Sequence, residues 1–540
     1  MEQVWAKNGT ILNNVELLKL KKDGLEVLKD IERYGQLGSS VITPDDIERL
    51  KWFGLYQQSP KAEGYFMMRI KLPGGVLTST QLRVITGISK DYGRGILDIT
   101  TRQALQFHWL RTQNLPDIFA RLAAVGLSSA GAAGDCPRNI LGHPLAGIDG
   151  DEVIDTSKLI QTVNQFFERN PDFSNLPRKF KISISGSRYN TGHAQINDVA
   201  LTPASKEING MTVVGFHIMV GGGLSRNPQL AQPIDAFILP EEVITVLAGV
   251  ATIFRDHGYR EKRTHARLKF LVADWGIRKF TVELLKLTGT LLTRGTDLTI
   301  DWNGGYFYGV HQQKQLGLNY IGLPAIGGRC TADDMMELAN LAEQYGDGAI
   351  RTSNSQNLIL ANIADEKVAA LLQESLLQRL IALEKSFSAY SVACVGKEFC
   401  PFGVAQTKAY IQPISHYLDQ HIPLDQPVRI YLSGCPHSCA QPQIADIGLQ
   451  GTVAKTTVPG VEAFEVWIGG SLVVNGVLGS KLQGHIAAED LPLVLEEFIG
   501  LYAENKEPTE TFTAFAKRIG LQDFQEKLNR FSLQVDSMLA

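Results

Sequence analysis

Four cysteines in the C-terminal half of the chain have a spacing suited to a metal cluster. They form a C-x5-C pair and a C-x3-C pair within stretches rich in glycine and proline: Cys394, Cys400, Cys435 and Cys439. Four thiolates are the ligands that a [4Fe–4S] cluster needs. Structural zinc sites usually have closer C-x2–4-C pairs, so this pattern favours a cluster. Buried thiols or two disulfides are the alternatives. Cys330 is expected to be structural, and the role of Cys136 stays open.

Four basic residues lie in segments that otherwise have the composition of ordered structure. Arg102 belongs to ITTRQALQFHW, Arg138 to GDCPRNILGHPLAG, and Lys179 and Lys181 to LPRKFKISISG. The two lysines are two apart on an expected strand, so both would point to one face. Each could be a solvated surface charge. Together they would form a cationic pocket that binds a small oxyanion, activates its oxygens and relays protons.

Length and composition indicate a multidomain globular protein. The chain has 540 residues, of which 44% are hydrophobic and 20% charged, and its net charge is −4. At roughly 150 residues per domain this means three or four domains. The charge balance gives no sign of nucleic-acid binding. No run of about 18 apolar residues occurs, so no membrane span is expected. The first residues do not resemble a secretory signal, and six cysteines are too few for a disulfide scaffold, which predicts a cytoplasmic location.

An internal duplication predicts how these residues are positioned. Gly64–Gln103 aligns without gaps with Gly317–Gln356, an offset of 253. At an offset of 248, KISISG aligns with RIYLSG, and FHIMVGGGL aligns with FEVWIGGSL. In the second alignment Ser187 and Thr191 stand where Cys435 and Cys439 stand. Only one half of a pseudo-twofold protein would therefore hold the metal.

Each repeat predicts a small unit followed by a larger one. An alternating strand at 65–71 precedes a Gly-Gly turn, a helix beginning at Thr78-Ser79-Thr80-Gln81 and a strand through 98–102. We therefore predict an α+β fold with two small half-domains and two larger α/β domains, and a site between the halves. The expected domains are a helical N-terminal arm at 1–60, a small unit at 61–130, a large unit at 131–305, a small unit at 306–380 and a large unit with C-terminal helices at 381–540.

The motifs together resemble the siroheme-dependent nitrite and sulfite reductases. The resemblance rests on the cysteine pattern with TRQALQFH, DCPRN, LPRKFK and SGCPHSC, and it extends from about residue 50 to 500. It implies ferredoxin-like half-domains and two siroheme/[4Fe–4S] domains. It also implies two coupled cofactors, siroheme and a [4Fe–4S] cluster, which share one cysteine thiolate.

The resemblance also assigns roles to the residues singled out above. Cys439 would be the shared axial ligand, and Cys394, Cys400 and Cys435 would complete the cluster. Four residues match the family's anion-binding and proton-supplying positions: Arg102, Arg138, Lys179 and Lys181. Siroheme carries eight carboxylates, so further basic residues should line its pocket, and the candidates are Arg69, Arg111 and Arg178. Whether Tyr56 or Cys136 is chemically modified stays open.

The implied reaction is a six-electron reduction of sulfite to sulfide or of nitrite to ammonia. Sulfite reductases of the family typically have lysine at both positions of the Arg-Lys-x-Lys segment, where plant and cyanobacterial nitrite reductases usually have asparagine at the second. Lys181 therefore favours sulfite. The Cys-Pro-Arg turn at Arg138 also differs from the Asn-Val-Arg common in those nitrite enzymes. A fully deprotonated sulfite is a dianion, which an extra cation would attract more strongly than nitrite. Nitrite stays the alternative.

The electron donor is expected to be a separate protein. No G-x-G-x-x-G fingerprint opens a helix after a strand, and no flavin domain is evident. By resemblance the donor is a ferredoxin, which is acidic and needs a basic docking patch. The densest basic stretch, 255–267, could be that patch or a surface turn that partly faces siroheme. Two rival interpretations are a relative acting in corrin-ring biosynthesis and a non-catalytic Fe–S subunit of a larger complex. The four basic residues argue against both.

Overall fold

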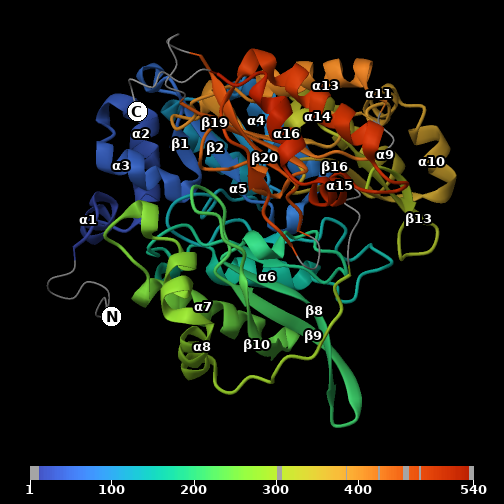
Figure 1. Ribbon diagram of the computed structural model, residues 1–540. Coiled ribbons are helices and arrows are strands. Elements are labelled where there is room, and N and C mark those ends of the chain that lie inside the picture. Colours follow the sequence, from blue (N-terminus) through green and yellow to red (C-terminus); the bar gives the residue numbers. More distant parts are fainter. Residues whose placement is uncertain are drawn as a thin grey trace, which may run out of the picture.

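The computed structural model describes residues 11–300, 307–384, 386–423, 426–453, 461–472 and 476–533, and within them the strands form four sheets. Two sheets are small and two belong to larger units (Figure 1). Helices pack on the sheets, so the fold is α+β with a duplicated architecture, as predicted. The boundary expected between residues 305 and 306 lies outside the described residues.

The two small sheets exchange a strand with each other. The first runs in the order β1 (Leu55–Gln57), β2 (Phe66–Ile70), β5 (Leu105–Leu110), β4 (Ile96–Ile99), β14 (Arg329–Thr331). The second runs β12 (Gly309–Gln312), β13 (Leu318–Leu323), β16 (Leu358–Ala364), β15 (Ala349–Thr352), β3 (Val76–Thr78). Strand β3 thus leaves its own repeat to pair with β15, and β14 pairs with β4. The sequence pattern did not predict this exchange.

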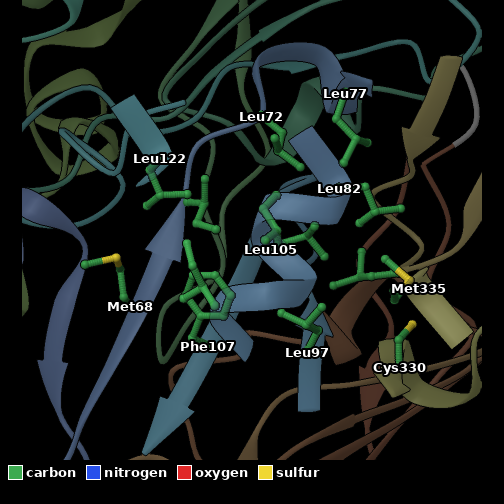
Figure 2. Packing of buried hydrophobic residues seen from close by; sticks show 14 of the residues in the cluster. Met68, Leu72, Leu77, Leu82, Leu97, Leu105, Phe107, Leu122, Cys330 and Met335 are labelled. Carbon is green, nitrogen blue, oxygen red and sulfur yellow. The ribbon is translucent and has the colours of Figure 1, made fainter. Parts of the chain in front are cut away.

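The helix of each small unit follows the exchanged strand directly. Helix α4 (Ser79–Tyr92) begins at Thr78, whose side chain and Gln81 form a capping box, as the polar start of the segment predicted. Its duplicate, α9 (Ala332–Tyr345), begins at Thr331. The two small units share one hydrophobic core. Figure 2 shows Leu97 and Leu105 of the first copy packed near Cys330 and Met335 of the second, so Cys330 is a buried core residue.

The large units each combine parallel and antiparallel strands. The first has the order β10 (Gln232–Ile238), β9 (Met211–Val220), β8 (Val199–Ile208), β7 (Ile182–Ile184), β6 (Leu141–Gly142), and β11 (Thr296–Asp297) pairs with β8. The second has the order β17 (Ser391–Ala393), β18 (Ile430–Ser433), β19 (Ile447–Thr452), β20 (Ala463–Ile468), β21 (Ser480–Lys481), and β22 (Ile486–Ala487) pairs with β20. In both, the strand before the Ser187–Thr191 or Cys435–Cys439 loop has parallel neighbours on either side.

Helices cover the large sheets and the N-terminal region. Helices α6 (Ser157–Phe167), α7 (Val243–His257) and α8 (Leu268–Thr288) bury apolar faces in the first large unit. The second has α12 (Gly396–Phe399), α13 (Lys408–His421), α14 (Leu491–Asn505), α15 (Phe512–Ile519) and α16 (Gln522–Asn529). The N-terminal segment forms α1 (Asn14–Lys21), α2 (Ile31–Leu37) and α3 (Pro44–Arg49), and the remaining helices are α5 (Leu115–Ala124), α10 (Asp365–Leu371) and α11 (Ser375–Ile381). The domain boundaries stay predictions.

Equivalent residues of the two repeats make equivalent contacts across the molecule. The Gln103 amide donates to the Thr352 carbonyl at 3.2 Å, and Gln356, its duplicate, donates to the Ile99 carbonyl at 2.7 Å. His193 and Gln441 are duplicates of each other and are themselves hydrogen-bonded, at 3.0 Å. A residue that touches its own counterpart lies at the pseudo-twofold axis. The duplication inferred from the sequence is therefore a spatial symmetry.

Candidate functional site

The four cysteines lie on two loops that follow neighbouring parallel strands. Cys394 follows β17 and Cys400 follows α12, whereas Cys435 and Cys439 lie on the loop after β18. Because β17 and β18 are parallel neighbours, the loops at their carboxyl ends meet at one edge of the sheet. Burial raises the pKa of Cys394, Cys400 and Cys435, and in each case the next contribution is the Cys439 thiol. Cys394 contributes in the same way to the pKa of Cys400 and Cys435, so the four thiols lie within electrostatic reach of one another.

Glycines hold the cysteine loops close together and supply donors to sulfur. The backbone N–H groups of Gly396 and Gly434 donate to Sγ of Cys394 at 3.4 and 3.2 Å. A Cβ at Gly434 would lie 2.6 Å from the Ala405 carbonyl oxygen, so only glycine fits there. N–H groups aimed at a ligand sulfur stabilise a thiolate and tune an iron–sulfur cluster.

The thiols are arranged for a cluster rather than for one ion. In the described part of the chain, no three His, Cys, Asp or Glu side chains gather around a point where a single metal ion could bind. Each thiolate of a [4Fe–4S] cube binds its own iron, so its ligands need not converge on one atom. Four thiolates, one for each iron, are the ligand set of such a cluster.

The duplicated half has hydrogen-bonding side chains in place of the cysteines. Helices α6 and α13, which follow the equivalent loops, begin 251 residues apart, and at that offset Cys394 and Cys400 fall on His143 and Asp149. His143 is buried and its ring nitrogens bond the Thr191 hydroxyl and the Asp149 carboxylate, both at 2.8 Å. Thr191 is the counterpart of Cys439. A closed hydrogen-bonded set thus replaces the metal ligands in this half.

The two halves of the site meet at Cys439. The Thr101 hydroxyl, on the turn that carries Arg102, donates to the Cys439 carbonyl at 2.9 Å. The symmetric contact runs from the Asn354 amide to the Thr191 carbonyl, at 2.7 Å. The sequence predicted that Arg102 lies on the strand through 98–102. Strand β4 instead ends at Ile99, so Arg102 lies in the turn that follows it. Gln103 closes that turn with a φ of 55°.

The guanidinium groups of Arg102 and Arg138 are fixed by oxygen acceptors. Arg102 donates to Asn197 Oδ1 at 2.8 Å and to the Asn139 carbonyl at 2.6 Å. Arg138 is buried and donates to the Gly134 carbonyl at 2.6 Å. These acceptors orient the two groups without neutralising them. Asn139 and Asn197 had not been singled out from the sequence.

Lys179 and Lys181 precede β7 in an extended segment. Phe180 between them is fully buried in the core of the first large unit, so the two lysines share the opposite side of the segment. The Lys181 backbone N–H donates to the Asp198 carboxylate at 2.8 Å. Strand β7 itself begins one residue later, at Ile182.

Burial and mutual repulsion weaken proton binding by these cations. Burial lowers the pKa of Lys181 to about 7, and the nearby charges of Arg102 and Arg267 act in the same direction. Burial also holds the pKa of Lys179 well below its usual range, with Lys181 as the next cause. Burial lowers the pKa of Arg102 to about 9, followed by the charge of Arg138. The Cys439 thiol raises the pKa of both lysines, so the cations adjoin the cysteine loops.

The site has largely enclosed positive charge that the protein leaves without carboxylate ion pairs. Five cations of the site, all within the described residues, form no ion pair with a carboxylate; Arg138 is buried and the others are partly buried: Arg69, Arg102, Arg138, Lys179 and Lys181. The Nε atoms of Arg69 and Arg102 are buried and have no hydrogen-bond partner. Buried charges normally pair. This set fits an anionic cofactor with many carboxylates, such as siroheme, together with a small anion.

Two further arginines lie beside the same set. Arg178 faces Asp135 at 3.7 Å, and the charge of Arg138 contributes to lowering its pKa after burial and Arg263. Arg267, which had been assigned only to the possible docking stretch, forms a buried ion pair with Asp198 at 2.9 Å. Asp446, the duplicate of Asp198, pairs with Arg429 in the same way. The aligned aspartates were the sequence signal that could have identified this pair.

Two sequence expectations differ from the structure. Arg111 is exposed and binds the Tyr65 hydroxyl at 2.9 Å, so it is not brought to the other cations. The stretch 255–267 is not a free basic surface, because its arginines have internal partners. Those partners are Asp256 for Arg255, Glu16 for Arg260, Asp135 for Arg263 and Asp198 for Arg267. A run of basic residues in the sequence does not show which of them form ion pairs within the folded protein.

The fold and site define a duplicated redox protein with a four-cysteine cluster site beside a cationic pocket. Residues 133–290 and 389–534 match the model of the nitrite and sulphite reductase 4Fe–4S domain, and residues 57–125 and 311–377 match the nitrite/sulfite reductase ferredoxin-like half domain. The chain belongs to the nitrite and sulfite reductase family.

Similar proteins include reductases of both kinds. A ferredoxin–nitrite reductase of Synechococcus elongatus is 40% identical over 496 residues, covering 90% of this chain and 96% of the relative. A protein named sulfite reductase [ferredoxin] 2, of Mycolicibacterium paratuberculosis, is 37% identical over 551 residues, covering 97% of this chain and 98% of the relative. The solved structure of the Mycobacterium tuberculosis NirA protein superposes with a TM-score of 0.89 at 34% identity, covering 96% of this chain and 99% of the NirA chain.

The family settles the cofactors and the enzymatic class. The protein is an oxidoreductase whose cofactors are siroheme and a [4Fe–4S] cluster. No helix among the described residues is long and apolar enough to cross a bilayer. The cytoplasmic location stays a prediction.

Proposed function

We propose that this protein is an assimilatory sulfite reductase that converts sulfite to sulfide with six electrons. The observation that supports this proposal is the pair of lysines, Lys179 and Lys181, which face the site without a carboxylate partner in the described part of the chain. In their protonated forms, two adjacent lysines favour a dianion over a monoanion. They also supply protons to oxygens that leave as water.

The cofactors would be held by residues of both halves. Cys394, Cys400, Cys435 and Cys439 would bind the cluster, and Cys439 would be shared with siroheme. Arg69 and Arg178, whose pKa values burial lowers, would pair with siroheme carboxylates. When bound, siroheme would supply an iron able to coordinate an anion, and the cluster would supply one-electron transfer.

Four side chains would act on the oxygens of the substrate. Arg102 and Arg138 are oriented by backbone and asparagine oxygens, so their remaining N–H groups can hold the anion in one position. Their guanidinium groups would offset the negative charge that accumulates as electrons arrive. Lys181, with a pKa of about 7, is suited to giving and regaining protons near neutral pH.

Nitrite reduction to ammonia is the second candidate. Relatives at 40% and 38% identity are named ferredoxin–nitrite reductase, whereas the similar sulfite reductase is at 37%. These values are too close to decide between the substrates. The relatives' names support a ferredoxin-type protein as electron donor for either reaction.

Replacing the second lysine tests the substrate assignment. We expect Lys181→Asn to lower kcat/KM for sulfite by about tenfold or more and to change that for nitrite less, because the lost cation matters more to a dianion. Lys158→Asn removes an exposed lysine of α6 and is the matched control. Activities are measured with reduced methyl viologen on siroheme-replete protein. Equal losses for both anions would refute a substrate-selecting role of Lys181.

A further inference from the structure

A cluster of arginines and aromatic rings stands at one end of the first small sheet. Tyr65 and Arg111 lie at the paired ends of β2 and β5, and Trp109 is near the end of β5. The Arg111 guanidinium is 4.4 Å from the centre of the Tyr65 ring, and that of Arg94 is 4.8 Å from the Trp109 ring. Both arginines also donate to the Tyr65 hydroxyl, at 2.9 and 3.4 Å. We call Tyr65, Arg94, Trp109 and Arg111 the Tyr65 patch.

The Tyr65 patch presents positive charge to solvent. Arg94 and Arg111 are exposed, and among the described residues neither forms an ion pair with a carboxylate. Their contacts to Tyr65 and Trp109 fix the guanidinium groups in place. Such pre-oriented cations lose less conformational freedom when they bind an anionic surface. The basic stretch 255–267, in contrast, has its arginines paired internally.

The patch is continuous with the cysteine loops. The Trp109 ring contacts the Phe399 ring edge-on, with centroids 4.6 Å apart, and His108 stacks on the same ring at 3.8 Å. Phe399 is buried and directly precedes the cluster cysteine Cys400. Its carbonyl accepts from the Ser59 N–H at 3.0 Å, which ties the cysteine loop to the segment before β2. One aromatic side chain thus separates the surface tryptophan from a cluster ligand.

Two patch residues adopt a backbone conformation that favours glycine. Arg94 has a φ of 55° and Trp109 a φ of 58°. The Trp109 N–H is fixed by Gln58 Oε1 at 3.0 Å. A left-handed backbone conformation is unfavourable for a residue with a large side chain and recurs at functional positions. The side chains of Arg94 and Trp109 are therefore retained at a cost to the backbone.

We propose that the Tyr65 patch is the docking surface for an acidic one-electron donor protein. This inference rests on the proposed function, since it names the surface that delivers electrons to the site. In each encounter the donor would lose one electron, and the [4Fe–4S] cluster that the four cysteines would hold would gain it. Six encounters would supply the six electrons that, with eight protons, convert sulfite to hydrogen sulfide and three waters. Carboxylates of the donor would pair with Arg94 and Arg111, and its redox centre would face Trp109 and Phe399.

The test compares two double variants with equal change in charge. Arg94→Gln with Arg111→Gln removes the patch charge. The control combines Arg379→Gln and Arg518→Gln, two exposed arginines that are paired with Asp334 and Glu510. Holoenzyme is titrated calorimetrically with an oxidised plant-type [2Fe–2S] ferredoxin at low and high salt. Turnover is measured separately with reduced ferredoxin and with reduced methyl viologen.

We expect the patch variant to bind ferredoxin about tenfold more weakly at low salt and to lose most of the salt dependence of binding. Its ferredoxin-driven kcat/KM should fall to the same degree, while its siroheme content, cluster content and viologen-driven turnover stay unchanged. Unchanged ferredoxin binding in the patch variant, or an equal loss in the control, would overturn the proposal. Absent viologen-driven turnover of the unmodified enzyme would instead contradict the proposed function, and the binding titration would still test the docking surface.

Discussion

Cys439 is the residue at which both halves of the site converge. Its thiol contributes to the pKa shifts of Cys394, Cys400 and Cys435, and its carbonyl accepts from Thr101 beside Arg102. It is exposed, whereas its duplicate Thr191 is buried against His143. This exposure on the side of the cationic pocket supports the proposal that Cys439 is the ligand shared by the two cofactors.

We expect Cys439→Ser to abolish the coupled siroheme and cluster spectrum. A serine hydroxyl is a poor ligand for both irons, so the shared bridge would be lost. The Thr101 contact uses the backbone carbonyl and should survive, so the fold should be retained. Absorption spectra and iron content measure the effect, and Cys330→Ser in the core is the control. An unchanged spectrum would refute the axial assignment of Cys439.

Among single residues, the sequence was informative where a short motif with fixed spacing indicates a chemical role. The two cysteine pairs and the basic residues at 102, 138, 179 and 181 could be found because short motifs fix them on loops that meet. Arg111 was proposed for the siroheme pocket, but the structure places it on the surface beside Tyr65. The sequence could not show this, because exposure and side-chain contacts depend on the tertiary fold. Arg267 was missed as a neighbour of Lys181 because its partner Asp198 is 69 residues away in the chain.

Strand exchange joins the two small units into one structural element. Duplication was visible in the sequence, but the exchange of β3 and β14 was not. Both are three-residue strands whose pairing is decided by tight packing at Gly75 and Gly328. Gly75 has a φ of 76°, and a Cβ there would lie 2.2 Å from the Thr352 carbonyl oxygen. No periodicity rule could indicate a partner 277 residues away.

Gly75→Ala should destabilise the fold far more than its neighbour Gly74→Ala. Both glycines have a positive φ, but a Cβ at Gly74 would meet only Ile160, at 3.6 Å. We expect a loss of about 1 kcal/mol for Gly74→Ala and at least about 3 kcal/mol for Gly75→Ala, where a backbone clash is added. Thermal melting of the two variants measures the difference. Equal decreases in melting temperature would contradict the close approach of Gly75 to the Thr352 carbonyl oxygen.

In the first half, the loop equivalent to the Cys394–Cys400 loop is followed by Glu152, whose carboxyl group is enclosed by the protein. Burial raises the pKa of Glu152 to about 7, and its Oε1 atom is buried without a hydrogen-bond partner. Oε2 accepts from the Gly147 N–H at 2.7 Å and from Lys314 at 3.3 Å. The loop is therefore held to the turn between β12 and β13 by a carboxyl that resists ionisation.

Glu152→Gln should stabilise the protein at pH 8 but not at pH 5. Because the folded pKa exceeds the usual value of 4.5, the folded state binds the proton more tightly than the unfolded state. The contribution to unfolding free energy is greatest below pH 4.5 and is lost, by up to about 3 kcal/mol, as pH rises to about 7. Melting temperatures at both pH values test this, with exposed Glu63→Gln as control. A variant less stable than the unmodified protein at pH 8 would show that Lys314 keeps the carboxylate favourably charged.

The whole molecule is a pseudo-symmetric fold in which only one of two equivalent loop regions carries the four cysteines. The small units share a core, so neither half is expected to fold alone. One half supplies the cysteines and the other the cations, and the two meet where Thr101 contacts Cys439. The halves thus complement each other in a single asymmetric site. The overall class and the duplication could be predicted because the repeat is visible in the sequence. The two cofactors were predicted from the resemblance that the four cysteines and the basic segments carry.

Substrate choice is the property that neither the symmetry nor the relatives decide. The Tyr65 patch and the cysteine loops would serve sulfite and nitrite equally, and relatives of both kinds are similarly close. The assignment depends on the charge of the pocket. The most direct test is kcat/KM for sulfite and for nitrite, measured side by side on siroheme-replete protein with reduced methyl viologen. The two-lysine pocket predicts a higher value for sulfite, and a clear preference for nitrite would contradict the proposed function.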